Sequence, residues 1–152
     1  MNKYKELNLI AKSFFNGIKE EITILSNATA LINDYIDDIS WVGFYLNKNN
    51  KLILGPFQGK VACMEIDFSK GVCGACARTQ EVQLVPNVHE FEGHIACDSR
   101  TNSEIVLPII IDGNFYGELD IDSMSFNRFN EEDKLGLEEF ITSLIKALKS
   151  AR

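Results

Sequence analysis

The sequence predicts an α+β fold, with a central antiparallel sheet, N- and C-terminal helices on one face and pocket-forming loops on the other. Apolar residues recur at three- and four-residue intervals near both ends of the chain, whereas the middle alternates with a period of two or forms short apolar runs. Two long connections, residues 60–80 and 87–102, hold all four cysteines and both histidines. Connections of this length are uncommon unless they are functional. The 152 residues contain no repeat or linker-like stretch, which predicts a single domain over residues 1–152.

The two ends of the chain are expected to be helical. The first amphipathic stripe consists of Leu7, Ile10, Phe14, Ile18 and Ile22. A second, shorter helix is expected after Asn27, with Ala28, Leu31, Ile32, Tyr35 and Ile36 on one side. At the C-terminal end, Asn130 can cap a helix whose first turn is acidic. Its apolar stripe consists of Leu137, Phe140, Ile141, Leu144, Ile145 and Leu148.

Strands are expected between these helices. The segments that fit are Trp41–Leu46, Lys51–Gly55, Val82–Val85, Glu104–Ile111 and Tyr116–Ile121. Residues 47–50 and 112–114 have the composition of hairpin turns. A short helix is expected after Gly71, through Cys76 to Thr79.

The charge of the chain limits the classes of partner. Its net charge is −7 and its pI is about 4.8, which argues against nucleic acid or an anionic membrane as the main partner. Lysines and a glutamate interrupt the first 15 residues, so no signal peptide is predicted, and the longest strongly apolar run, Ile105–Ile111, is too short to span a bilayer. We therefore expect a cytoplasmic protein.

The cysteine spacing by itself leaves three interpretations open. Cys73 and Cys76 form a C-x-x-C, but a thioredoxin-like site would require a βαβ unit around it, and this pattern is antiparallel. A zinc site could draw on Cys63, Cys73, Cys76, His89, His94 and Cys97. Free cysteines are also common as buried packing residues, and spacing alone slightly favours that interpretation.

Carboxylates and aromatic residues in the predicted strands favour a pocket instead. Asp120 and Asp122 are two residues apart and share a face, and the hairpin at residues 112–114 would bring Glu104 beside them. Such a cluster needs a cation, a metal or a hydrogen-bonding ligand, unless the face is solvated. Trp41 and Tyr45 are also co-facial, so together these side chains could form a box for a small molecule that bears an amine or sulfur.

The most specific features of the sequence are six ordered blocks, residues 55–63, 71–74, 88–89, 93–98, 103–108 and 119–123. Together these blocks resemble the GAF-domain free methionine-(R)-sulfoxide reductases. The resemblance extends from about Trp41 to the final helix. It implies a GAF-type fold, no cofactor and no metal, with free methionine-(R)-sulfoxide as substrate and thioredoxin or a similar dithiol as reductant. A GAF sensor that binds a small ligand without turnover is the alternative, and the sequence does not distinguish a monomer from a homodimer.

The resemblance also implies roles for individual residues. Cys97 corresponds to the nucleophile, Cys63 to the usual resolving thiol, and Cys73 to a further participant in disulfide chemistry. Trp41, Tyr45, Glu104, Asp120 and Asp122 correspond to residues that line the substrate pocket. Glu104 and Asp122 are the candidates for donating a proton to the sulfoxide oxygen, because neighbouring acids raise the pKa of at least one of them. Cys76 departs from the family pattern, which more often has a small non-thiol residue there, and this leaves the resolving thiol open.

Overall fold

The fold is built on six antiparallel strands, seen in a computed structural model that describes residues 2–95 and 97–152. The helices are α1 (Lys3–Phe14), α2 (Glu21–Tyr35), α3 (Gly71–Thr79) and α4 (Glu131–Ala151), with a 3-10 turn, η1, at Val88–Glu90. The strands are β1 (Trp41–Lys48), β2 (Lys51–Gln58), β3 (Glu65–Asp67), β4 (Gln83–Val85), β5 (Ser103–Ile111) and β6 (Asn114–Ser123). Their order across the sheet is β3-β2-β1-β6-β5-β4, so β1 and β6 lie at its centre.

Both predicted hairpins are confirmed. β1 and β2 are joined at Asn49 and Asn50, which both have positive φ, and β5 and β6 at Asp112 and Gly113, which also have positive φ. Two consecutive residues with positive φ are the requirement of the tight hairpin turns whose twist matches that of paired strands. Each turn therefore fixes the register of its hairpin.

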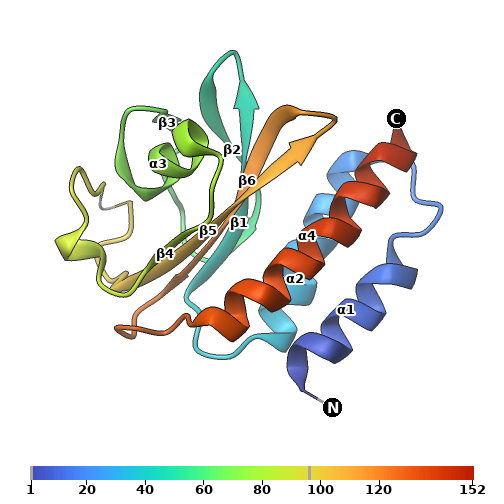
Figure 1. Cartoon of the computed structure of the whole chain (residues 1–152), viewed down its shortest axis with the longest axis horizontal. Coiled ribbons are helices and arrows are strands. Elements are labelled where there is room, and N and C mark those ends of the chain that lie inside the picture. The colour runs from blue at the N-terminus through green and yellow to red at the C-terminus, as the bar shows by residue number, and fades with distance from the viewer. Residues whose placement is uncertain (1, 96) are drawn as a thin grey trace.

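Helices α2 and α4 pack on one face of the sheet, and α1 packs against them on the same side, so the terminal helices share one face as predicted (Figure 1). The main core lies between this layer and the sheet, and alternate strand residues such as Ile105, Leu107, Leu119 and Ile121 contribute to it. The cap of α4 is also confirmed, because the Asn130 side chain accepts a hydrogen bond from the amide of the third helical residue. With one face of the sheet covered in this way, the alternate residues of each strand point to the opposite face.

The predicted positions of the first two helices were partly wrong. The apolar stripe predicted one helix through Ile22, but α1 ends at Phe14 and Gly17 follows with a φ of 80°. A residue in this left-handed region ends a helix readily when it is glycine. The chain then reverses and α2 begins at Glu21 instead of after Asn27, which leaves Phe14 and Ile22 exposed.

Four of the five predicted strands are longer than their patterns predicted, and β4 is one residue shorter. β2 continues through Pro56 to Gln58, β6 covers Asn114–Ser123, and the short strand β3 and the turn η1 were not predicted. The predicted strand ended at Gly55, just before Pro56; strand edges and bulges tolerate proline, and the pairing of β1 with β2 shifts register at this point. The extra length of β2 carries Phe57 into the face opposite the helices.

That opposite face is covered by α3, η1 and the long connections (Figure 1). A second apolar cluster forms there and includes Trp41, Tyr45, Val72 and Cys76. The sheet is therefore buried on both faces, and polar side chains on this second face are enclosed.

Candidate active site

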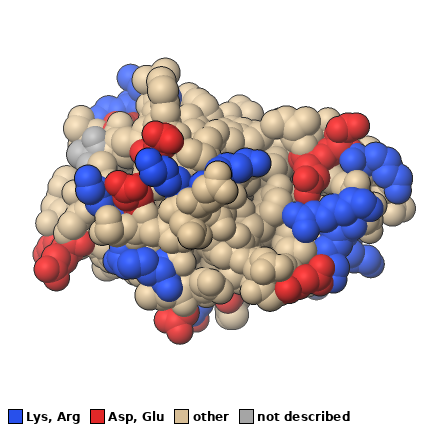
Figure 2. Space-filling view, turned by 90° about the horizontal axis from the view of Figure 1, so that it is seen from above, with Lys and Arg blue, Asp and Glu red and all other residues tan. Residues whose placement is uncertain are grey.

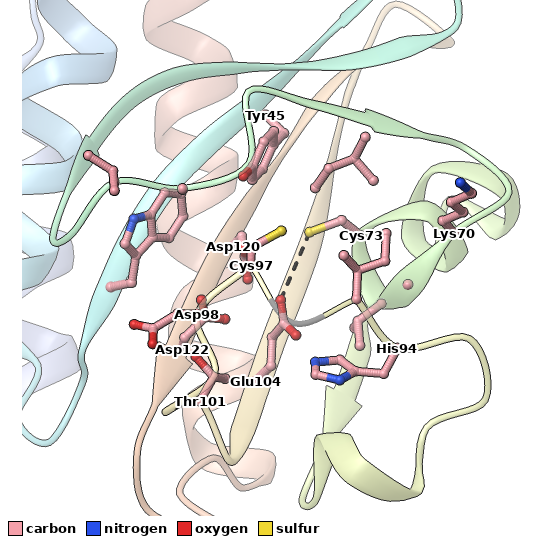
Figure 3. A pocket seen from close by; sticks show the side chains of 17 residues that line it. Tyr45, Lys70, Cys73, His94, Cys97, Asp98, Thr101, Glu104, Asp120 and Asp122 are labelled. Carbon is pink, nitrogen blue, oxygen red and sulfur yellow. Dashed lines mark hydrogen bonds between the residues drawn. The ribbon is translucent and has the colours of Figure 1, made fainter.

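A cavity opens on this second face, over β1, β5 and β6. It encloses about 540 Å³ of empty space, counting its open mouth. Seven of the eight side chains predicted for the site line it, as Figure 3 shows for most of them. They are Trp41, Tyr45, Cys73, Cys97, Glu104, Asp120 and Asp122. The eighth, Cys63, does not line the cavity and packs against the second apolar cluster.

Stacked aromatic rings form one wall of the cavity. The rings of Trp41 and Tyr45 are 6.0 Å apart at their centroids, and Phe57 stacks on the other side of Trp41 at 5.3 Å. Gly43 lies between the two β1 aromatics, and a Cβ there would collide with the indole ring and with Phe57. The predicted co-facial pair is therefore present. Phe57 adds a third ring, which was not predicted because the expected strand ended at Gly55, before Phe57.

A disulfide joins Cys63 to Cys97 across 34 residues of sequence, with their Cα atoms 5.4 Å apart. Each half-cystine comes from one of the two long connections. The amide of Gly71, at the start of α3, donates a hydrogen bond of 3.0 Å to the carbonyl of Gly93 and so holds the connection that carries Cys97 against α3. Two loops that are distant in sequence are thus brought together at the edge of the cavity.

The three predicted carboxylates lie together on the floor. In the sheet register Glu104 is opposite Asp122, and Asp122 is opposite Trp41 on the other side. Glu104 and Asp120 are almost fully buried, whereas part of Asp122 faces the cavity. One oxygen of Asp120 and one of Asp122 have no hydrogen-bond partner. A buried oxygen without a donor is costly, so the floor favours a ligand that brings N–H or O–H groups.

Burial strongly perturbs these acids. It raises the pKa of Asp120 well above its ordinary value, and the nearby Asp122 and Glu104 add to the rise. Burial likewise raises the pKa of Asp122, with Glu104 contributing through its charge. Protein atoms surround Asp122 closely even though its tip faces the cavity. The raised pKa values favour the protonated form of these acids, which is the form that a proton donor requires.

Asp98 behaves in the opposite way. Arg100 donates hydrogen bonds of 3.0 and 2.8 Å to its two oxygens, and these bonds lower the pKa of Asp98. Asp98 therefore stays ionised at the rim, next to Cys97, and is unsuited to donate a proton. The sequence motif around Cys97 contained Asp98, but only the fold brings the Arg100 guanidinium onto it.

A fourth acid, Glu118, was missed. It lies on β6 on the same face as Asp120, is 0% exposed, and neither of its oxygens has a hydrogen-bond partner. Burial raises the pKa of Glu118 well above its ordinary value, and the thiols of Cys73 and Cys76 beside it offset part of the rise. Glu118 was not among the predicted site residues, although the period of two along β6 places it on the same face as Asp120 and could have revealed it.

The remaining thiols lie on α3, where Cys73 lines the cavity and Cys76 does not. Cys73 and Cys76 are both free and buried, and the Cys73 thiol is 3.9 Å from a Glu104 oxygen, the contact drawn as a dashed line in Figure 3. Burial raises the pKa of both thiols. Their surroundings are helical and antiparallel, unlike the βαβ unit that a thioredoxin-type C-x-x-C requires.

The zinc set suggested by spacing does not assemble within the described residues. Cys97 is bonded to Cys63 and so cannot offer a thiolate, and His89 instead lies 2.7 Å from the Asn102 side chain. In residues 2–95 and 97–152, the His, Cys, Asp and Glu groups close enough to share an ion are Cys73, Glu104 and Asp120. This set lies within the carboxylate floor and contains no histidine.

Acidic and basic side chains are interspersed over the face that Figure 2 shows. None of the helices in the described residues has the length and apolar character needed to cross a bilayer.

Comparisons with known proteins show the family of the chain. Residues 20–148 match the GAF domain family model. The chain is 44% identical to the free methionine-R-sulfoxide reductase of Escherichia coli, covering 97% of this chain and 92% of that protein. Among solved structures, the reduced form of fRMsr of Staphylococcus aureus is 47% identical, with a TM-score of 0.94 over 97% of this chain and 96% of that one. The free methionine-R-sulfoxide reductase of Neisseria meningitidis, solved with its substrate, is 36% identical, with a TM-score of 0.94 over 98% and 90% of the two chains. The chain therefore belongs to the GAF-domain free methionine-(R)-sulfoxide reductase family.

Proposed function

We propose that this protein reduces free L-methionine-(R)-sulfoxide to L-methionine, with Cys97 as the nucleophile, Cys63 as the resolving thiol and a dithiol protein such as thioredoxin as the reductant. The observation that carries the proposal is the position of the Cys63–Cys97 disulfide, because one of its sulfur-bearing residues lines a cavity floored by acids with unpartnered oxygens. Cys97 is the half that lines the cavity, which supports its assignment as the attacking thiol.

In the first step the Cys97 thiolate attacks the sulfoxide sulfur. The sulfoxide oxygen takes a proton and passes to Cys97, so that methionine leaves and Cys97 becomes a sulfenic acid. Asp122 and Glu104 are the proposed sources of that proton. The raised pKa of Asp122 supports this role, since a carboxyl group must be protonated at neutral pH to donate.

The same floor would recognise the substrate amine. An ammonium group offers three N–H donors and a positive charge, and the unpartnered oxygens of Asp120 and Asp122 are the acceptors in reach of the cavity. Trp41 and Tyr45 would hold the S-methyl group against the aromatic wall. A methionine sulfoxide inside a peptide has lost the ammonium, so the pocket favours the free amino acid.

In the second step the Cys63 thiol condenses with the sulfenic acid, which releases water and forms the disulfide. Two thiols of the reductant then supply two electrons and restore both cysteines by exchange. Cys73 is the alternative resolving thiol, but its burial and the neighbouring charges disfavour its thiolate. Such a cycle fits a cytoplasmic location, where thiol reductants are maintained.

The experiment compares three substrates under one small dithiol: free (R)-, free (S)- and N-acetyl-(R)-methionine sulfoxide. Methionine formation should be fast with the free (R) form. N-acetylation removes the charge that pairs with a buried carboxylate, so kcat/KM should fall roughly a thousandfold. The (S) epimer should also fail, because with the amine and methyl anchored its oxygen points away from the acid. Equal rates on the free and acetylated (R) forms would show that the acids do not recognise the amine.

A further inference from the structure

The segment that carries Cys63 presents an unusual apolar surface. Within the described residues, its Val61 and Met64 are the most exposed large hydrophobic side chains, at 88% and 79%. A single exposed apolar residue needs no explanation. Here, however, two of them stand within three residues of each other and flank a half-cystine of the cavity disulfide.

Hydrogen bonds fix this exposure. The indole N–H of Trp41 donates to the Lys60 carbonyl at 3.1 Å, the Tyr45 hydroxyl donates to the Cys63 carbonyl at 2.8 Å, and the Leu54 amide donates to the Met64 carbonyl at 3.0 Å. The backbone is thus attached on its inner side, while the Met64 side chain stands in solvent. The segment is held as a preformed apolar surface, and preformed surfaces lose little entropy on binding.

The two half-cystines differ in position. Cys97 lines the cavity, whereas Cys63 does not; it follows Val61 and Ala62, which line the cavity, and precedes the exposed Met64, which does not. Exchange requires the incoming thiolate to approach one sulfur from the side opposite its bonded partner. A protein that attacks the Cys97 sulfur would have to reach a residue of the cavity lining, whereas Cys63 adjoins the exposed Met64.

We propose that residues 60–64 form the docking surface for the protein dithiol that regenerates the enzyme, and that this reductant attacks the Cys63 sulfur. This inference rests on the proposed function. The reductant thiolate forms a bond to Cys63, the Cys63–Cys97 bond breaks, and Cys97 leaves as a thiolate that can take a proton. The second reductant thiol then attacks the mixed disulfide and releases Cys63, so that the reductant is oxidised by two electrons and both cysteines are reduced.

The choice of Cys63 as the attacked sulfur determines which cysteine is freed first. Attack on Cys63 frees Cys97 first, directly into the cavity where the next sulfoxide binds. The docking surface fits a protein whose reactive thiol is surrounded by apolar surface, because the side chains of Val61 and Met64 offer that protein no charge or hydrogen bond.

The first test substitutes Met64, which does not line the cavity. Met64→Asp places a charge in the docking surface, and we expect KM for reduced thioredoxin to rise at least tenfold. Turnover with dithiothreitol should stay within about twofold of wild type, because a small dithiol needs no docking surface. Leu135→Asp on α4, where the native side chain is 62% exposed, is the matched control and should change neither rate.

Comparing thioredoxin with dithiothreitol distinguishes a failure of the docking surface from a failure of the proposed function. An unchanged KM for thioredoxin in Met64→Asp, or an equal loss with both reductants, would overturn the docking surface. Absence of methionine formation by wild type with dithiothreitol would instead contradict the proposed function. The attacked sulfur is tested with thioredoxin whose second active-site cysteine is replaced by serine, which traps the mixed disulfide. Peptide mapping should place the trapped reductant on Cys63, and its location on Cys97 would refute the proposed direction of attack.

Discussion

Replacing Glu118 by glutamine should stabilise the oxidised protein at neutral pH. Glu118 is 0% exposed and neither of its oxygens is hydrogen-bonded, and burial raises the pKa of its carboxyl group well above the ordinary value. The folded state therefore retains a proton on Glu118 that the unfolded chain releases above about pH 4.3. Glutamine keeps the shape of the side chain and has no proton to lose in this range.

The sign and size of the effect follow from proton linkage. A group whose pKa is higher in the folded state than in the unfolded state makes stability depend on pH. Its contribution to the free energy of unfolding is fully present below the pKa of the unfolded state and is lost as the pH rises through the pKa of the folded state. In that window each pH unit lowers the free energy of unfolding by about 1.4 kcal/mol per retained proton. Between pH 5.5 and 7.5 the wild type should therefore lose up to about 2.7 kcal/mol that Glu118→Gln keeps.

Urea unfolding measures this difference directly. Trp41 is the only tryptophan and is buried, so its fluorescence reports unfolding. Keeping the disulfide oxidised prevents Cys63 and Cys97 from titrating. The raised acids Asp120 and Asp122 act in both proteins and cancel in the comparison.

Glu138→Gln, which removes an exposed carboxylate on α4, is the control and should follow the wild-type pH profile. The pH-dependent part of the difference in unfolding free energy between wild type and Glu118→Gln should vanish below about pH 4, where the unfolded carboxyl is protonated as well, and grow steadily above it. Parallel profiles from pH 5.5 to 7.5 would refute the reasoning, because they would mean that Glu118 is already ionised in the folded state.

Three further substitutions test the site. Cys97→Ser should retain less than about a hundredth of steady-state turnover, because a neutral hydroxyl is a far poorer nucleophile than a thiolate; a rate above that limit would exclude Cys97 as nucleophile. Cys76→Ala should keep turnover near wild type with dithiothreitol, since Cys76 lies beneath the cavity wall, and a strong loss would reopen the C-x-x-C interpretation. Gly43→Ala should raise KM for the sulfoxide at least several-fold, because its Cβ would displace the Trp41 ring and Phe57; an unchanged KM would show that the aromatic wall does not bind substrate.

The sheet could be predicted from the sequence because one of its faces carries apolar side chains against the helices and the other carries acids toward the cavity. Leu119 and Ile121 face the helices while Asp120 and Asp122 face the cavity, and a period of two along β6 is sufficient to separate them. The turn at Asp112 then brings Glu104 beside Asp122, so the carboxylate floor followed from local pattern and one hairpin.

Features that depend on loop geometry were not predictable in the same way. Apolar spacing alone did not reveal the reversal at Gly17, because Ile18 and Ile22 continue the stripe by coincidence of spacing. The pairing of Cys63 with Cys97 depends on where two long connections meet, and no periodicity encodes that position. Glu118 lies on the same face of β6 as Asp120 and Asp122, but its burial depends on the packing of α3 over β6.

The central claim is that Cys97 takes the sulfoxide oxygen, and trapping the oxidised cysteine tests it most directly. Reduced Cys63→Ser protein, freed of reductant and given one equivalent of free methionine-(R)-sulfoxide, should release close to one methionine per chain. Mass spectrometry after treatment with a sulfenic-acid probe such as dimedone should place the adduct on Cys97. Under this account Cys97 carries the adduct in proportion to the methionine released. Release of methionine with Cys97 unmodified, and the oxidation on Cys73 or Cys76 instead, would contradict it.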